Sequence, residues 1–143
     1  MVTLIVTLVL AVSYPAVSKG SAALHLRAAS RDVMNVFRYA REKAVSEQKG
    51  IRVTVDRQKQ ELVLSDDFGD NSRKYLPPGD IKIHRVSLGD DEVTDGPVVI
   101  RFLPNGSSDR AEVLLRSDAG SSVRILTDPI SGGARIEQVS GRD

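Results

Sequence analysis

The residues that could carry chemistry are few and far apart in the chain. The two histidines, His25 and His84, belong to different predicted elements, and the sequence contains no cysteine. The absence of cysteine excludes a disulfide framework, a thiolate zinc site, an iron–sulfur cluster and a cysteine nucleophile. A lone strand histidine is more commonly exposed or hydrogen-bonded than a metal ligand, so we expect this of His84. For His25, on a predicted helix, we expect packing.

One acidic segment offers oxygen ligands. Residues 66–72 read DDFGDNS, which calcium could accept, but the alternating spacing of a calcium loop is missing. We therefore expect residues 66–70, and likewise 90–92, to form solvated loops. The sequence contains no Gly-x-Ser-x-Gly elbow, phosphate-binding glycine loop or His-Glu-x-x-His motif. Neither an enzyme nor a metal or cofactor site is predicted.

Composition narrows the class of partner. The chain has 143 residues, enough for one domain and an appendage. Its 20 basic and 19 acidic side chains give a net charge of +1, whereas a dedicated nucleic-acid binder usually has a marked basic excess. Aromatic content is 4% with no tryptophan, which is low for base stacking or a carbohydrate cleft.

The N-terminal segment is almost wholly apolar. Residues 1–18 read MVTLIVTLVLAVSYPAVS, and the first charged residue is Lys19. As a helix this run would be about 27 Å long, close to the roughly 30 Å hydrocarbon core of a bilayer. A membrane-inserted or helix-packed segment is the favoured interpretation. A cleaved secretory signal, which needs a basic region ahead of its apolar core, and an ordinary buried helix are the alternatives.

Helical periodicity continues beyond the apolar run. A stripe at helical spacing predicts the face that packs on the rest of the chain, and its members are Leu26, Val33, Phe37, Ala40 and Ala44. The other faces are left to charged residues, namely Arg27, Arg31, Arg38, Arg41, Glu42 and Glu47. Pro15 predicts a kink rather than a break. Gly50 is the expected stop, with Lys49 in the last turn.

After Gly50 the apolar period changes to two, which predicts strands. About seven short strands are expected, around residues 51–55, 62–64, 81–84, 98–102, 113–116, 123–125 and 136. The turns between them are rich in proline and glycine, as in Pro77-Pro78-Gly79, and the Asn105-Gly106 pair favours a tight turn into the strand at 113–116. This pattern predicts an antiparallel sandwich or strongly curved sheet, one face of which packs on the amphipathic helix.

The order of these segments resembles a known family. The helix end FRYAREKAVSEQKG, the turn IRFLPNGSS and the closing LTDPISGGARI are similar to those of the GspH/FimT-like minor pseudopilins. The resemblance implies an α+β, pilin-like fold, with a long N-terminal helix packed on a small antiparallel β-sandwich. It also implies a structural subunit of a type II secretion pseudopilus or a type IV pilus, supporting protein secretion or fibre assembly.

The resemblance further implies partners and a location. Other pseudopilin or pilin subunits and the bacterial inner membrane are the expected partners, in a single-pass protein whose β-domain is periplasmic. Residues 1–19 would be the membrane or fibre-core half, and residues 20–143 the periplasmic domain, with an amphipathic helix at 20–49 and a β-domain at 50–143. The residues expected in the membrane or fibre core are Leu4, Ile5, Leu8, Leu10, Val12 and Pro15.

The start of the sequence departs from the family pattern. The family's basic leader, the glycine after which prepilin peptidase cleaves, and the glutamate that follows are missing from the sequence before the apolar run. We therefore expect the true start upstream of Met1 and would count the peptidase as a partner in that case.

The alternative function is a DNA-binding minor pilin for DNA uptake, because some FimT-like members use a basic C-terminal tail. The possible contacts here are Arg135 and Arg142, although two terminal arginines are more often simply solvated.

Overall fold

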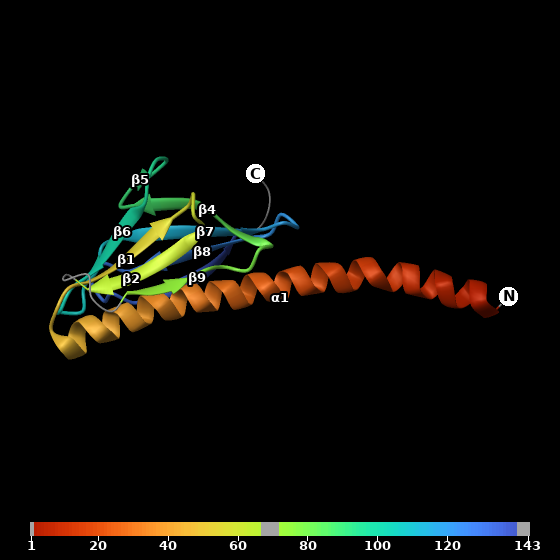
Figure 1. Cartoon of the computed structure of the whole chain (residues 1–143), viewed down its shortest axis with the longest axis horizontal. Helices are drawn as coiled ribbons and strands as arrows, with labels where there is room; N and C mark the ends of the chain where they lie inside the picture. The colour runs from red at the N-terminus through yellow and green to blue at the C-terminus, as the bar shows by residue number, and fades with distance from the viewer. Residues whose placement is uncertain (1, 67–71, 140–143) are drawn as a thin grey trace.

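The structure, a computed structural model, describes residues 2–66 and 72–139, with side chains from Ala23 onward. One helix, α1 (Val2–Glu47), runs unbroken through Pro15 and projects well past the sheets at its N-terminal end (Figure 1). No helix in the part of the chain with described side chains is long and apolar enough to cross a membrane. The six side chains predicted for the membrane or fibre core, from Leu4 to Pro15, lie outside that part.

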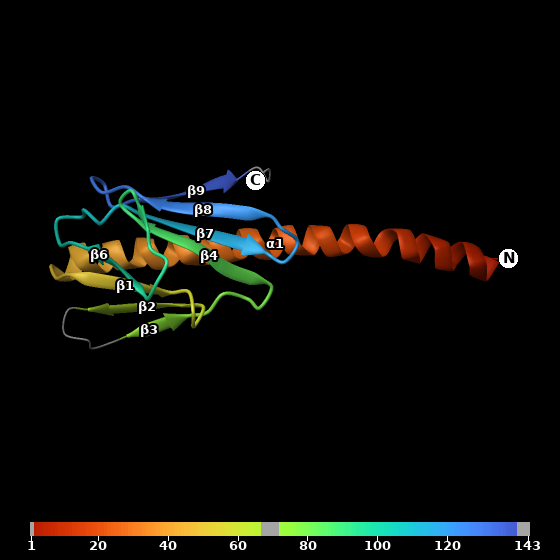
Figure 2. The ribbon, with the colours of Figure 1, turned by 90° about the horizontal axis from the view of Figure 1, so that it is seen from above.

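Nine strands form two antiparallel sheets among the described residues. The four-stranded sheet has the order β3-β2-β1-β6, made of β1 (Ile51–Asp56), β2 (Glu61–Asp66), β3 (Arg73–Tyr75) and β6 (Val98–Phe102). The five-stranded sheet has the order β5-β4-β7-β8-β9, made of β4 (Ile81–Leu88), β5 (Asp91–Glu92), β7 (Ala111–Ser117), β8 (Ser122–Thr127) and β9 (Ala134–Val139). β3 and β9 lie at opposite margins of the domain (Figure 2).

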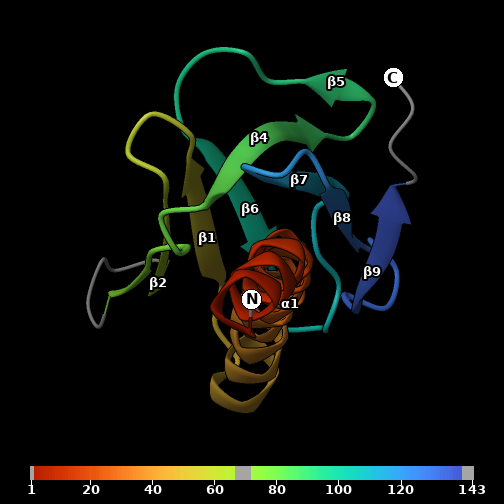
Figure 3. The same ribbon diagram turned by 90° about the vertical axis from the view of Figure 1, so that its right-hand side faces the viewer.

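The helix closes the space between the sheets. Viewed along α1, β1 and β2 lie on one side of the helix and β8 and β9 on the other (Figure 3). All five predicted stripe residues, from Leu26 to Ala44, are buried, as are alternate residues of the strands that face them. The rings of Phe37 and Phe102 have centroids 6.1 Å apart and join the helix to β6. The predicted α+β fold and the packing face of the helix are thus confirmed.

A glutamine joins the two sheets at the β1–β2 turn. The side chain of Gln60 accepts a hydrogen bond from the Ile83 amide at 2.7 Å and donates to the Ile83 carbonyl at 3.2 Å. The pairing of β4 with β7 shifts register between Ile83 and Arg85. Gln60 therefore pairs with β4 in the way a neighbouring strand would, at the point where the ladder is irregular.

The helix ends earlier than predicted. It stops at Glu47, and the left-handed residue that follows is Gln48, with φ of 51°, rather than Gly50. Gln48 Nε2 donates to the carbonyls of Val45 at 2.6 Å and Pro104 at 3.3 Å. These hydrogen bonds satisfy two backbone carbonyls. They offset the free-energy cost of the left-handed backbone conformation in a residue other than glycine.

The tight turn predicted at Asn105-Gly106 is present, with the Gly106 amide donating to the Leu103 carbonyl at 3.0 Å, but the flanking strands β6 and β7 belong to different sheets. Two predictions of solvated loops were wrong, and two short strands were missed. Asp66 is not in a solvated loop: it ends β2, its side chain is 3% exposed, and Lys49 Nζ lies 3.3 Å from Oδ2. Asp91 and Glu92, expected in a solvated loop, form the exposed strand β5. Strands β3 and β5 were missed because neither has an alternating apolar pattern. Residues 67–71 lie outside the described chain.

Candidate interaction surfaces

The three motifs of the sequence meet at the C-terminal end of α1. Arg41, from the helix motif, donates through Nε to the carbonyl of Gly106 at 3.3 Å. Gly106, with φ of 90°, is in the turn between β6 and β7. The Ser108 amide, just after this turn, donates to the Pro129 carbonyl of the closing motif at 3.3 Å. Three segments far apart in sequence therefore meet at one place, which we call the junction: Arg41, the turn at residues 103–108 and the closing turn at residues 128–133.

The closing turn, residues 128–133, fits this junction because of Gly132. Its φ is 68°, and an added Cβ would collide with the Gly106 carbonyl oxygen and lie 3.0 Å from Arg41 Cδ. Asp128 holds the turn by accepting from the amides of Ile130 at 2.8 Å and Ser131 at 3.3 Å. These hydrogen bonds lower the pKa of the Asp128 carboxyl below its ordinary value. The junction secures the helix to both turns.

Arg41 is the junction residue that sequence reasoning missed. We assigned its side chain to the outer faces of the helix, but the guanidinium reaches the β6–β7 turn. Its place in the AREKAV motif, near the end of the helix, was the available signal. Spacing alone could not reveal the contact, because Gly106 is 65 positions away in the sequence.

A groove lies between α1 and the margin of the four-stranded sheet. Its volume is about 420 Å³, and its apolar lining includes Val36, Leu62 and Leu64. Tyr75 donates a hydrogen bond to Asp32 Oδ2 at 3.3 Å across the groove, and burial followed by the Asp32 charge raises the pKa of Tyr75 above its ordinary value. The Arg73 guanidinium lies 5.1 Å from the Tyr39 ring centroid, a cation–π contact that bridges the same two elements.

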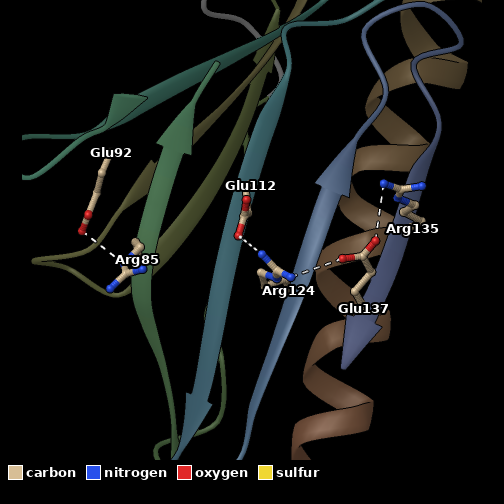
Figure 4. A network of polar contacts seen from close by, with 6 residues as sticks. All are labelled: Arg85, Glu92, Glu112, Arg124, Arg135 and Glu137. Carbon is tan, nitrogen blue, oxygen red and sulfur yellow. Dashed lines mark hydrogen bonds and ion pairs between the residues drawn. The ribbon is translucent and has the colours of Figure 1, made fainter. Parts of the chain in front are cut away.

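The outer face of the five-stranded sheet carries a charged network (Figure 4). Arg124 on β8 lies between Glu112 on β7, at 3.4 Å, and Glu137 on β9, at 3.5 Å. Arg135 pairs with Glu137 at 3.4 Å. On β4, Arg85 pairs separately with Glu92 at 3.2 Å. Because Arg85, Arg124 and Arg135 each have a carboxylate partner, the network presents alternating charges rather than a basic patch.

A hollow of about 620 Å³ adjoins this network where β8 leads into the closing turn. Arg110, Glu112 and Arg135 contribute charged groups to its lining. At its edge the Ile130 side chain is 89% exposed. Arg135, one of the two predicted DNA contacts, therefore lies in a region of mixed charge, and Arg142, the other, lies outside the described residues.

The histidines occupy separate places. We expected the His25 side chain to be packed, but it is 54% exposed, and its Nδ1 lies 2.7 Å from Asp80 Oδ2. This hydrogen bond lowers the pKa of the Asp80 carboxyl. His84 is an exposed strand residue, as expected. Within residues 2–66 and 72–139, no three metal-ligating side chains come together.

Known proteins place this architecture in a family. The profile described as type II transport protein GspH matches residues 29–132. The fold is similar to two solved structures of the minor pseudopilin EpsH from the type II secretion system of Vibrio cholerae. One has a TM-score of 0.64 and 10% identity, over 80% of this chain and 97% of EpsH. The other has a TM-score of 0.66 and 11% identity, over 83% and 97%.

A search of the curated proteins gives no match. The profile match alone spans most of the sequence and includes the first two motifs and residues 126–132 of the closing motif. The resemblance read from the sequence is thereby confirmed, and the chain belongs to the GspH family of type II transport proteins.

Proposed function

We propose that the chain serves as a minor pseudopilin, a structural subunit that assembles with other pseudopilin subunits into a type II secretion pseudopilus. The observation that carries this proposal is the length of α1. The helix begins at Val2, whereas the first described helix residue in the core is Leu26. About 36 Å of helix therefore precedes the packed part, more than the β-domain needs for its own core.

The free half of the helix has the composition of a membrane segment. We infer that residues 1–19 insert in the bacterial inner membrane as a single pass and later pack in the fibre core, with residues 20–143 in the periplasm. The support is the uncharged run from Met1 to Ser18 together with membership of a family that is membrane-associated on the periplasmic side. As in the rest of this non-enzymatic family, the role requires surfaces rather than a catalytic site.

Isolation of the fibre from cells tests the proposal. The full chain, and its Leu8→Arg and Leu8→Met variants, would be produced in cells that lack their own copy, and sheared pseudopili would be probed for each. Leu8→Arg should be depleted from membranes and fibres, because a charge near the middle of an apolar span costs about 2.5–3.5 kcal/mol. Leu8→Met should match wild type. Leu8→Arg at wild-type level in the fibre would contradict the proposal.

DNA binding through Arg135 and Arg142 stays a prediction. The pairing of Arg135 with Glu137 gives it no support, because a neutralised arginine releases fewer counterions from DNA.

A further inference from the structure

The outer face of α1 carries three arginines, Arg27, Arg31 and Arg38, that have no acidic partner within residues 23–66 and 72–139. All three are exposed, and none makes an ion pair with any residue that the structure describes. At about 100° per residue they fall within an arc of about 40°, and they span about 16 Å of helix. We call these three residues the arginine stripe.

The acidic residues of the helix do not neutralise the stripe. Asp32 points to the groove, where it accepts from Tyr75, and Glu47 pairs with Lys49 at 3.1 Å. Glu42 is on the same side as the stripe but lies one turn beyond Arg38, and the structure shows no ion pair between them. The stripe therefore presents a row of three positive charges along the helix, none of which is in an ion pair with a residue that the structure describes.

We propose that the arginine stripe docks against a row of carboxylates on the helix of a neighbouring pseudopilin subunit. Helices that pack at the shallow crossing angle of about 20° stay in contact over several turns, so carboxylates spaced one and three turns apart on such a neighbour would meet all three guanidinium groups. Arginine pairs with a carboxylate through two parallel hydrogen bonds, which adds specificity as well as attraction. The inference rests on the proposed function, because it places this chain among other subunit helices.

Position along the helix argues against lipid as the partner. Arg31 and Arg38 would lie about 18 and 28 Å beyond residue 19, whereas the headgroup layer adds only about 5–7 Å to each side of the hydrocarbon core. DNA is disfavoured by the net charge of +1, since each further acidic group on the protein opposes the phosphates.

A binding assay tests the chemistry of the stripe. The probe is a synthetic amphipathic helical peptide with three glutamates at the spacing of the stripe, and its matched control has glutamines instead. Binding to the full chain in neutral detergent would be followed by fluorescence anisotropy at low and high salt. We expect the glutamate peptide to bind better, and combined Arg27→Glu, Arg31→Glu and Arg38→Glu to weaken binding by at least about tenfold.

Matched variants separate charge from geometry and from global effects. Replacing the same three arginines by lysine should retain part of the binding. Lys82→Glu, which changes an exposed cation on the five-stranded sheet, should leave it unchanged, and circular dichroism would verify the fold of every variant. Equal binding of both peptides, or a response only to phosphatidylglycerol vesicles or to a DNA duplex, would overturn the inference.

Fibre isolation then distinguishes this inference from the proposed function. We expect the triple glutamate variant to reach the membrane at wild-type level but to be lost from sheared pseudopili. If the variant enters fibres as well as wild type does, the stripe is not an interface, although the protein remains a subunit. If wild type itself is absent from the fibres, the proposed function fails.

Discussion

Gly132 and Gly106 lie in direct backbone contact, although they belong to turns in different parts of the sequence. The Gly132 Cα faces the Gly106 carbonyl so closely that a Cβ would collide with the oxygen. The same oxygen accepts the hydrogen bond from Arg41. The helix and both turns therefore depend on one close approach, which only glycine allows at residue 132.

Gly132→Ala should lower the free energy of unfolding by more than about 1 kcal/mol, because it combines left-handed strain with a backbone collision. Chemical denaturation would measure the effect. Gly120→Ala is the matched control, because Gly120 has φ of 92° but nothing within 4 Å of an added Cβ. Equal losses for the two variants would show that strain alone matters and that the close approach does not.

Asp66→Ala should cost more stability than Glu47→Ala, although both carboxylates pair with Lys49. The Asp66 side chain is 3% exposed and that of Glu47 is 45% exposed. Loss of a buried charged partner costs about 1–3 kcal/mol, whereas an exposed pair contributes less than about 1 kcal/mol. Urea unfolding would measure the free energy of unfolding of both variants. A larger loss for Glu47→Ala would show that burial of the carboxylate does not decide the strength of its pairing with Lys49.

His25→Ala should raise the pKa of Asp80 toward its ordinary value of 3.8, because the hydrogen bond from His25 is the first cause of its lowering. The folded-state pKa of Asp80 lies below its unfolded value, so its contribution to stability is present above pH 3.8 and is lost as pH falls through the folded pKa. Carboxyl-carbon NMR titration would follow both states of the side chain.

Asp128 is the internal control for that titration. Its pKa is lowered by the backbone amides of Ile130 and Ser131, so removal of the His25 side chain should leave it unchanged. Parallel shifts of Asp80 and Asp128 would indicate a general loss of structure instead of a broken hydrogen bond.

Arg135→Ala combined with Arg142→Ala should have little effect on DNA affinity if the chain is a structural subunit. If DNA uptake were the function, the salt dependence of binding would flatten by up to about two units of slope. Anisotropy titration with duplex DNA at physiological salt would decide. Submicromolar affinity that the double variant abolishes would favour DNA uptake.

Removal of residues 1–19 should leave a soluble, folded domain. The first buried core residue that the structure describes is Leu26, so the truncated chain keeps the buried helix face from Leu26 to Ala44 that packs on both sheets. Circular dichroism would show helix and strand together with a cooperative thermal transition. An insoluble or unfolded product would show that the first helix half contributes to folding of the domain.

Local patterns determined the elements of this protein. The stripe from Leu26 to Ala44 and the alternation of Ile51, Val53 and Val55 predicted which faces are buried, and the burial agrees. These predictions succeed because periods of 3.6 and 2 reflect backbone geometry, which each segment expresses without reference to the others. The apolar run at residues 1–18 belongs to the same class of signal, and its membrane role stays a prediction.

Only the tertiary structure decided how the segments meet. β6 and β7 flank one tight turn yet belong to different sheets. The helix ends at Glu47, and Gln48 rather than Gly50 takes the left-handed conformation, with its side chain donating to the distant Pro104 carbonyl. The hydrogen bond between Arg41 and Gly106 could not be predicted from the sequence around either residue. Such contacts join residues far apart in the chain, so their geometry depends on the packing of the whole core and not on the preference of any one segment.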